Sequence, residues 1–236
     1  MKLVLMQPYF FPYIGYFQLM NLCDEFIAFD TVQYIKKGWI NRNRILHPEG
    51  NPTYVNVPIQ KFKSNTLIKD ILIDNTVNWK QTIINRLQQY YKTAPYKEEV
   101  LTFLGNCLNE EFSYLSELNV HLLRETCNYL NINCRINSLS KCHYEYEKAA
   151  ASDEWGLNIC KALNAKTYIN APGGIVFFDK NKYWKENIDI KFINPTYNRY
   201  SQNREAFISG LSILDVMMFN SVEDIQKMLL SYEEIY

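Results

Sequence analysis

Two short apolar runs separated by a helical pattern open the chain, and they constrain its fold more than any other feature. Residues 2–7 (KLVLMQ) form an apolar run that stops at Pro8, which is typical of a buried strand. Residues 14–23 (IGYFQLMNLC) place apolar side chains at roughly helical spacing, and residues 25–30 (EFIAFD) form a second apolar run. Strand, helix and strand within this length are typical of a compact βαβ unit with parallel strands. The opening therefore predicts an α/β fold.

The rest of the chain alternates strand and helix patterns around one long helical block. Residues 41–46 and 53–58 flank a turn-rich segment and predict a hairpin, and residues 67–73 (LIKDILI) predict another strand. From about residue 78 to residue 131 the pattern is helical, which predicts an insertion or subdomain on the sheet. The later segments are expected to form strands at 134–138, 166–170 and 187–193, and helices at 153–165, with Ser152 or Asp153 as its cap, at 212–219 and at 222–232.

Taken together, these patterns predict a single α/β domain over residues 1–236, with a helical insertion at about 78–131.

Composition excludes some classes of function. Lys plus Arg and Asp plus Glu both number 25, so a net charge of +0 argues against sequence-independent binding of nucleic acid. The sequence has no apolar run of the roughly 18 residues that a membrane span needs, and its first residues do not resemble a signal peptide. We therefore expect a cytoplasmic protein.

Cysteine and histidine spacing gives no metal pattern. The 6 cysteines contain no C-x-x-C pair, and the 3 histidines are scattered. Reduced thiols are expected in a cytoplasmic protein. The sequence predicts no metal site and leaves the cofactor unknown, with a nucleotide or an acyl donor as the open alternatives.

Polar residues follow each expected strand at the point where it ends. In open parallel sheets, ligands bind beyond the carboxyl ends of the strands. If the strands are parallel neighbours, these side chains converge on one crevice. The residues are Gln7 and Tyr9 after the first strand, Asp30 and Gln33 after the second, Asn170, Gly173 and Gly174 after the third, and Asn194 and Tyr197 after the last.

Gly15 and Asp30 each allow two interpretations. Gly15 opens a helix directly after the first strand, where a helix N-terminus suits a phosphate. The same glycine could instead allow the helix to pack closely on the strand. Asp30 could serve as a general base or a ribose partner, and it could equally cap the following turn. The pair Gly173–Gly174 either lets backbone approach a ligand or forms a turn.

Residues 37–44 (KGWINRNR) add a cluster of donors. In a strand, Asn41 and Asn43 face one way while Arg42 and Arg44 face the other. An arginine fork matches phosphate or carboxylate, and asparagine both donates and accepts. With Lys37 and Trp39 nearby, we expect at least one arginine to bind a ligand. The alternatives are a solvated hairpin surface and a Trp39 packed in the core.

The opening and the tail together resemble a known family. The stretches QPYFFPYIGYFQLM (7–20) and CDEFIAFDTVQYIKKGWINRNRI (23–45) resemble the WbqC-like family. So does the segment 200–220, although Ser209–Gly210 stands where a proline is expected. In that segment the matching residues are Gln202, Phe207, Ser212, Ile213 and Asp215. Members are associated with gene clusters for O-antigen and other surface polysaccharides. The resemblance implies modification of activated sugars, with acyl or aminoacyl transfer to an amino sugar as the favoured reaction.

A more distant resemblance concerns residues 13–16. Tyr13-Ile14-Gly15-Tyr16 occupies the place of the His-x-Gly-His motif of HIGH-superfamily nucleotidyltransferases. Tyrosine is neutral near pH 7, so the fold could be shared while the chemistry differs. The strand pattern predicts a Rossmann-like, mainly parallel sheet. The resemblances imply that it binds a nucleotide-activated sugar, with Tyr9, Tyr13 and Tyr16 near the ligand. The rival functions are a nucleotidyltransferase and a non-catalytic binding or scaffold protein.

Overall fold

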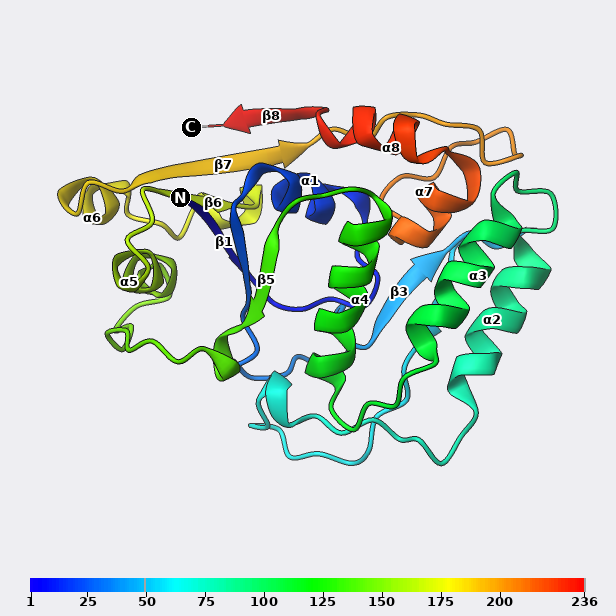
Figure 1. The fold of residues 1–236 in the computed structure, drawn as a ribbon, viewed down its shortest axis with the longest axis horizontal. Coiled ribbons are helices and arrows are strands. Elements are labelled where there is room, and N and C mark those ends of the chain that lie inside the picture. The colour runs from blue at the N-terminus through cyan, green and yellow to red at the C-terminus, as the bar shows by residue number, and fades with distance from the viewer. Residues whose placement is uncertain (49, 236) are drawn as a thin grey trace.

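A mostly parallel sheet forms the centre of the molecule, as the computed structural model shows for residues 1–48 and 50–235 (Figure 1). Its strand order is β5-β2-β1-β6-β7-β8. Neighbouring strands are parallel except that β8 runs antiparallel to β7. The strands are β1 (Lys2–Met6), β2 (Glu25–Ala28), β5 (Arg135–Ser138), β6 (Thr167–Asn170), β7 (Asp189–Pro195) and β8 (Tyr232–Ile235). This arrangement confirms the expected Rossmann-like α/β fold.

The βαβ unit at the start of the chain explains how the sheet begins. Strand β1 pairs with β2 from Leu3 opposite Glu25 to Met6 opposite Ala28, and α1 (Ile14–Leu22) connects them. Both faces of these strands are covered, so their sequences are apolar without alternation. Val4 packs into the core on the α1 face, whereas Leu3 and Leu5 pack into a second cluster on the opposite face.

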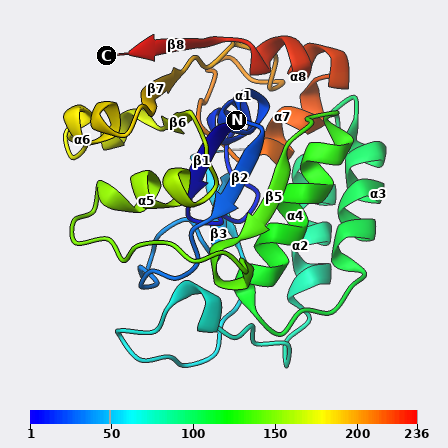
Figure 2. The same cartoon turned by 60° about the vertical axis from the view of Figure 1, so that its left-hand side comes forward.

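Helices cover both faces of the sheet. In Figure 2 the strands stand between α5 on one side and α2, α3 and α4 on the other. The helical block expected at 78–131 is present as three helices, and α4 lies against β5. The helices are α2 (Trp79–Tyr90), α3 (Lys97–Leu108), α4 (Leu115–Tyr129), α5 (Glu154–Ala162), α6 (Lys180–Lys185), α7 (Ile213–Phe219) and α8 (Val222–Leu229).

The strand order changes direction between β1 and β6. Strands β2 and β5 lie to one side of β1, and β6, β7 and β8 lie to the other. Where the strand order reverses, the loops that follow the two neighbouring strands run in opposite directions. They leave a crevice between them at the carboxyl ends of those strands. The fold therefore places the loop after β1, residues 7–13, at a position where Rossmann-like proteins bind ligands.

The expected hairpin is present and lies beside the loop after β1. Strands β3 (Arg42–Ile45) and β4 (Thr53–Asn56) pair antiparallel, from Arg42 opposite Asn56 to Ile45 opposite Thr53. The Phe10 amide donates to the Trp39 carbonyl at 3.1 Å, which joins the loop to the segment before the hairpin. The hairpin therefore packs beside the carboxyl end of the sheet.

Two elements differ from the expectation. Residues 67–73 do not form a strand: they contain a 3-10 turn, η1 (Ile68–Asp70), flanked by isolated bridges. Ile68, Ile71 and Ile73 are buried in the main apolar core, and the bridges are too isolated to make a strand. The chain also ends in strand β8, where two helices alone were expected. Its alternation of Tyr, Glu, Glu and Ile is short, and only pairing with β7 makes it a strand.

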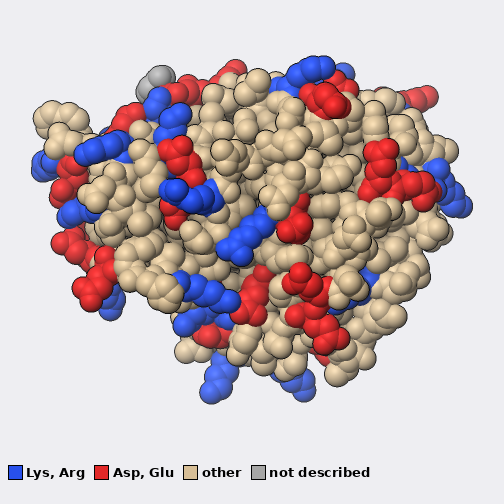
Figure 3. All heavy atoms as spheres, viewed as in Figure 1, with Lys and Arg blue, Asp and Glu red and all other residues tan. Residues whose placement is uncertain are grey.

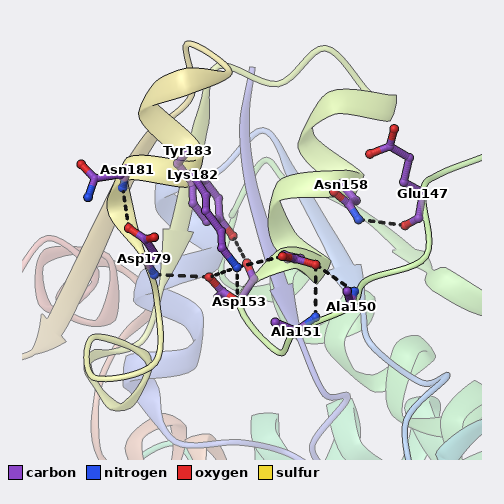
Figure 4. Close-up of polar contacts among 10 residues, drawn as sticks. Glu147, Ala150, Ala151, Asp153, Asn158, Asp179, Asn181, Lys182 and Tyr183 are labelled. Atoms are coloured by element: carbon purple, nitrogen blue, oxygen red, sulfur yellow. Dashed lines mark hydrogen bonds and ion pairs between the residues drawn. The ribbon is translucent and has the colours of Figure 1, made fainter.

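The start of α5 is held by an ion-pair network and not by the expected cap. Asp153 stands at the N-cap position but makes no side-chain capping bond. Figure 4 shows its carboxylate and Lys182 of α6 pointing toward one another, and Lys182 Nζ lies 3.1 Å from Asp153 and 2.8 Å from Glu154. Tyr183 Oη donates to the Asp153 carbonyl at 2.8 Å. This network joins α5 to α6 across the second core cluster.

Candidate functional site

The loop after β1 is held in a defined shape by a buried amide from the hairpin. Asn43 is 4% exposed, and its Nδ2 donates to the carbonyls of Phe10 at 3.1 Å and Phe11 at 2.9 Å. Phe11 has a φ of 39°, a conformation that residues other than glycine rarely adopt. Asn43 therefore has a structural role, and the same is true of Asn41, which accepts from Tyr34 and donates to Val57.

Two further buried side chains hold the same loop, and the sequence analysis did not identify their role. Asn119 of α4 is fully buried, and its Nδ2 donates to the carbonyls of Pro8 at 2.8 Å and Ile40 at 2.7 Å. Ser212 Oγ donates to the Phe11 carbonyl at 2.8 Å. An asparagine in the middle of an apolar helix pattern was the available signal, because a buried amide must find partners. The helical block thus helps to shape the loop.

Four tyrosines surround the start of α1. The Tyr9 and Tyr16 rings lie 5.5 Å apart between centroids, and the Tyr13 and Tyr197 rings lie 6.0 Å apart. Tyr16 donates to the Gln7 carbonyl. Burial, with Tyr197 and Tyr9 nearby, raises the pKa of Tyr13 to about 12. At neutral pH Tyr13 is thus a hydrogen-bond donor and cannot serve as an anion.

Arg42, Arg44, Trp39 and Tyr54 form one surface of the hairpin, which we call the arginine–aromatic face. The Arg42 guanidinium lies 4.3 Å from the centre of the Tyr54 ring, and that of Arg44 lies 5.5 Å from the centre of the Trp39 ring. The two rings are themselves 6.3 Å apart. Trp39 is 36% exposed and Tyr54 is 39% exposed, so this face presents cations and rings to solvent.

Arg44 links this face to the tyrosines. Its Nη2 donates to the Gly210 carbonyl at 3.4 Å, and its Nε is buried without a hydrogen-bond partner. Burial raises the pKa of Tyr197, and the charge of Arg44 acts in the opposite direction, which places the two side chains close together. A buried N–H of a guanidinium without a partner is costly.

Arg42 lies at the other end of the face and is more firmly held. Its Nε donates to the Gly38 carbonyl at 3.2 Å and its Nη2 donates to the Lys37 carbonyl. Lys37 has a φ of 62°, a left-handed conformation that lysine rarely adopts. Beside Arg42 lies a cavity of about 300 Å³, which we call the Arg42 pocket. The two arginines therefore belong to two neighbouring parts of one surface.

Asp30 has the environment of a structural carboxylate. It is 1% exposed, and it accepts from Ser116 Oγ at 3.0 Å, from the Ser140 amide at 2.9 Å and from Ser140 Oγ at 2.5 Å. These bonds join β2 to α4 and to the turn after β5. Because its oxygens are already used inside the protein, we do not include Asp30 in the proposed site, and its role as a base stays a prediction.

Gly15 is explained by packing. A Cβ at this position would lie 2.3 Å from the Tyr13 ring and 2.7 Å from Pro195 Cβ. A glycine is needed here because the start of α1 contacts the side chains of both Tyr13 and Pro195. Gly15 was expected either to bind a phosphate or to allow close packing, and the contacts of the structure favour close packing.

The other expected site residues lie apart from this surface. Gln33 is exposed and donates to the Ser64 carbonyl at 2.6 Å. Asn170 accepts from the amide of Ala171, and a Cβ on Gly174 would lie 2.7 Å from Asn170 Nδ2, whereas a Cβ on Gly173 would meet open space. Asn194 is exposed within β7, which continues to Pro195. None of them makes a described contact with the arginine–aromatic face.

Asp215 is the centre of a buried network in the tail segment. It is fully buried and accepts from Tyr91 Oη at 2.7 Å, Tyr200 Oη at 2.5 Å and Gln202 Nε2 at 2.9 Å. Burial raises its pKa, and these three hydrogen bonds act in the opposite direction. Ser212, and not Asp215, caps α7. The network fixes the segment that carries Tyr197 and Gly210.

A second, larger cavity lies elsewhere and has a different character. Its volume is about 790 Å³, and it lies beside β5 and α4 with Glu25, Glu117, His121 and Lys141 among its lining residues. Several of these charges already have partners: Lys141 contacts Glu117 at 2.7 Å, and Glu25 contacts Arg135 at 3.1 Å. Within residues 1–48 and 50–235, no group of three or more His, Cys, Asp or Glu residues is arranged to hold a metal ion. None of the residues nominated from the sequence lines this cavity.

Fold and site together define a Rossmann-like α/β protein with a cationic and aromatic surface at the carboxyl end of its sheet. The chain belongs to the WbqC-like protein family, whose model matches residues 7–227. It is similar to the uncharacterised protein Rv1507c of Mycobacterium tuberculosis (strain ATCC 25618 / H37Rv), at 32% identity over 222 residues that cover 93% of each chain. No solved structure matches it. These comparisons do not support the more distant resemblance to HIGH-superfamily nucleotidyltransferases.

The described part of the chain contains no helix that is both long and apolar enough to cross a membrane. Figure 3 shows Lys and Arg intermixed with Asp and Glu over one face of the molecule, as the net charge of +0 implies. All six cysteines are free thiols. The closest pair is Cys23 and Cys134, whose sulfur atoms lie 3.3 Å apart.

Proposed function

We propose that the protein is a transferase that acts on a nucleotide-activated amino sugar in surface-polysaccharide biosynthesis, with acyl or aminoacyl transfer as the favoured reaction. Membership of the WbqC-like family suggests a role in a polysaccharide gene cluster. The observation that carries the proposal is the arginine–aromatic face beside Tyr13 and Tyr197. Rings and neutral phenols suit sugars and bases, and arginine suits phosphate.

In this proposal the parts of the surface have different tasks. Trp39 and Tyr54 give the ligand flat apolar contacts, and Tyr13 donates a hydrogen bond. Arg44, whose guanidinium lies beside the Trp39 ring, donates a hydrogen bond to an oxygen of the sugar or its acyl group. The loop 7–13 is rigid because its carbonyls are held from three sides, so the site is preorganised.

One observation favours a second candidate, a non-catalytic protein that binds nucleotide sugars. Asp30 and Asp215 are both buried and hydrogen-bonded inside the protein, and no carboxylate lines the Arg42 pocket. Removing a proton from an amine nucleophile needs a base near the ligand. In the transferase, that base has to come from the substrate or from a residue outside this surface.

The test is a thermal-shift screen of the purified protein with UDP-, dTDP- and GDP-linked amino sugars, coenzyme A, ATP and CTP, each with and without Mg²⁺. A ligand that binds only the folded state raises the melting temperature. We expect a shift with one nucleotide-sugar group and a loss of at least about tenfold in affinity in Arg44→Ala, with partial recovery in Arg44→Lys.

The outcome then separates the candidates. Turnover of the shifted sugar with an acyl or aminoacyl donor supports the transferase. A shift without turnover supports the binding protein, and a shift only with ATP or CTP plus Mg²⁺ contradicts both in favour of nucleotidyl transfer. No shift with any nucleotide sugar contradicts the proposal.

A further inference from the structure

The Arg42 pocket differs in charge from the rest of the molecule. Three cationic side chains line it, Lys36, Lys37 and Arg42, and none of its lining residues is acidic. The whole chain carries a net charge of +0, so three cations without an acid are a local excess. Among the residues that the structure describes, no carboxylate forms an ion pair with any of the three.

The positions of these cations are set by the surrounding structure. Arg42 is fixed by the carbonyls of residues 37 and 38 and lies over the Tyr54 ring. Lys36 Nζ lies 5.1 Å from the centre of the Phe62 ring. Two of the charges thus lie beside aromatic rings that also line the cavity. A solvated surface would leave both side chains free to move, whereas here their positions are restricted before a ligand arrives.

The backbone around the pocket is also fixed. Asn41 accepts from Tyr34 Oη at 2.8 Å and donates to the Val57 carbonyl at 2.9 Å. These bonds hold the segment from residue 34 to residue 41 against the strand that ends in Asn56. Lys37 therefore keeps its left-handed backbone in a closed turn, with the Gly38 amide donating to the Ile35 carbonyl at 3.2 Å.

Size and charge together limit the ligand. A volume of about 300 Å³ is at the small end of ligand sites, so the pocket accommodates one part of a larger ligand. Three separate cations exceed what a single carboxylate needs, and they match two linked phosphate groups. Tyr54 and Phe62 also give the pocket apolar walls, and the attraction between opposite charges is stronger beside apolar groups than in bulk water.

We propose that the Arg42 pocket is the subsite for a diphosphate ester, held by Lys36, Lys37 and Arg42. The proposal rests on the function proposed above, because it divides one ligand between two places. The diphosphate occupies the Arg42 pocket, and the group that it carries extends across Trp39 and Tyr54 toward Arg44 and Tyr13. A diphosphate ester has two sources in polysaccharide chemistry, a nucleoside diphosphate and a lipid-linked diphosphate, and both present the same charged group.

The test measures binding of small diphosphate probes by isothermal titration calorimetry. Wild-type protein is titrated with inorganic pyrophosphate, UDP, GDP, dTDP and farnesyl diphosphate at two salt concentrations. We expect binding that weakens as salt rises. The double variant Lys36→Ala/Lys37→Ala should lose at least about tenfold in affinity for every probe that binds.

The matched control is Lys61→Ala/Lys63→Ala. Both lysines are exposed in the segment that carries Phe62, but neither lines the pocket. This variant loses the same charge as the pocket variant. Because exposed charges that do not line the pocket are partly screened by salt, its affinity should stay within about twofold of wild type. An equal loss in both double variants would show a general charge effect and overturn the proposal.

A second readout does not depend on substitutions. Pyrophosphate or UDP should protect Lys36 and Lys37 of the wild-type protein from an amine-acetylating reagent, while Lys61 and Lys63 are labelled as in its absence. Peptide mass spectrometry quantifies the labelling.

The titrations also separate the two sources of the diphosphate. Tighter binding of farnesyl diphosphate than of any nucleotide assigns the lipid source, and the reverse order assigns the nucleotide source.

The two proposals fail in different ways. Binding of a nucleotide sugar that depends on Arg44 and is unaffected in Lys36→Ala/Lys37→Ala overturns the diphosphate subsite and leaves the proposed function standing. Pyrophosphate binding that the pocket variant loses, in a protein that binds no nucleotide sugar, supports the subsite and contradicts the function. Absence of binding for every diphosphate probe overturns the subsite.

Discussion

At the scale of single residues, buried amides do more to build the site than the exposed cations that first attract attention. Asn119 holds both the loop after β1 and the segment before the hairpin, through the carbonyls of Pro8 and Ile40. We expect Asn119→Ala to lower the free energy of unfolding by about 2–4 kcal/mol, because two buried carbonyls lose their donor. Urea unfolding followed by circular dichroism measures it. Asn106→Ala, at an exposed position of α3, is the control and should be close to neutral.

Two glycines give a paired residue-scale prediction. Gly15→Ala should cost at least about 2 kcal/mol of unfolding free energy, because the new Cβ overlaps the Tyr13 ring and Pro195. Gly173→Ala meets open space and should be neutral or stabilise by up to about 1 kcal/mol. Thermal unfolding of both variants gives the comparison. Equal melting temperatures would show that the start of α1 is not tightly packed.

At the scale of elements, Asp215 fixes α7 against the end of α2 and the tail segment. Tyr91 follows α2, and its hydroxyl accepts from the Leu46 amide at 2.9 Å while it donates to Asp215 at 2.7 Å. The carboxylate thus connects β3, α2 and α7 through a single phenol. This explains why a charged residue is retained in the apolar sequence ILDVMMF.

Tyr91→Phe should therefore weaken the contact between these elements. Loss of the hydroxyl removes the acceptor of the Leu46 amide and one of the three donors to the buried Asp215 carboxylate, and we expect a cost of about 2–4 kcal/mol in unfolding free energy. Tyr90→Phe is the control: Tyr90 is only half-buried, and its described contact is a ring contact with His47 at 4.9 Å. Chemical denaturation should separate the two variants by at least about 1 kcal/mol, and indistinguishable curves would contradict a structural role for the network.

At the scale of the whole molecule, buried phenols and thiols make the fold sensitive to alkali. Burial raises the pKa of Tyr16 and Tyr91 well above the usual value, and burial raises the pKa of Cys160 to about 12. In the unfolded chain these groups ionise near their ordinary pKa of roughly 8.5–10, whereas in the folded protein they stay neutral. Their contribution to stability is thus complete below that range and declines as pH rises toward their folded pKa.

We therefore expect the melting temperature to be nearly level from pH 7 to pH 8 and to fall from about pH 9 upward. Between its pKa in the unfolded chain and its pKa in the folded protein, each such group lowers the free energy of unfolding by up to about 1.4 kcal/mol per pH unit. Calorimetric scans from pH 7 to pH 11, with tyrosinate absorbance recorded in parallel, measure both quantities. Phenol ionisation that precedes unfolding would show that the rings are accessible in the folded state.

The helical block gives the second whole-molecule prediction. One apolar cluster contains Phe26 of β2, Leu87 of α2 and Leu123 of α4, so the core runs from the sheet into the helices without a break. We propose that residues 1–236 unfold as one domain. A single transition with matching fluorescence and circular dichroism curves is expected in urea. Two separated transitions would show that the block around residues 78–131 is an independent subdomain.

The sequence alone was informative where local pattern and burial coincide. The apolar runs at 2–7 and 25–30 with the helix between them are enough to specify a parallel pair, since such a crossover permits little else. The alternation in residues 41–44 also placed Arg42 and Arg44 on one side of the hairpin, opposite Asn43. These features depend on neighbours within a few residues, which a sequence displays directly.

Long-range partners decided the rest. The expected strand at 67–73 did not form, since its residues make only isolated bridges with residues 33, 59 and 114, whereas β8 formed by pairing with β7. Asp30 proved to be bonded to Ser116 and Ser140, which lie far along the chain. Tyr54, a wall of the Arg42 pocket, carried no signal of its own until β4 was placed beside β3.

The chain's own pattern thus determined the parallel α/β class, the order of its opening elements and the positive hairpin, because each follows from periodicity and from the residues that end strands. Only the tertiary structure decided which polar groups are free to meet a ligand. Hydrogen bonding is a matter of partners, and a buried asparagine or aspartate is committed or free according to residues that the fold brings from elsewhere. By that criterion Asn43 and Asp30 are committed to partners inside the protein. Arg42 and Arg44 are the side chains that we propose for ligand binding, because their charges lie beside exposed rings.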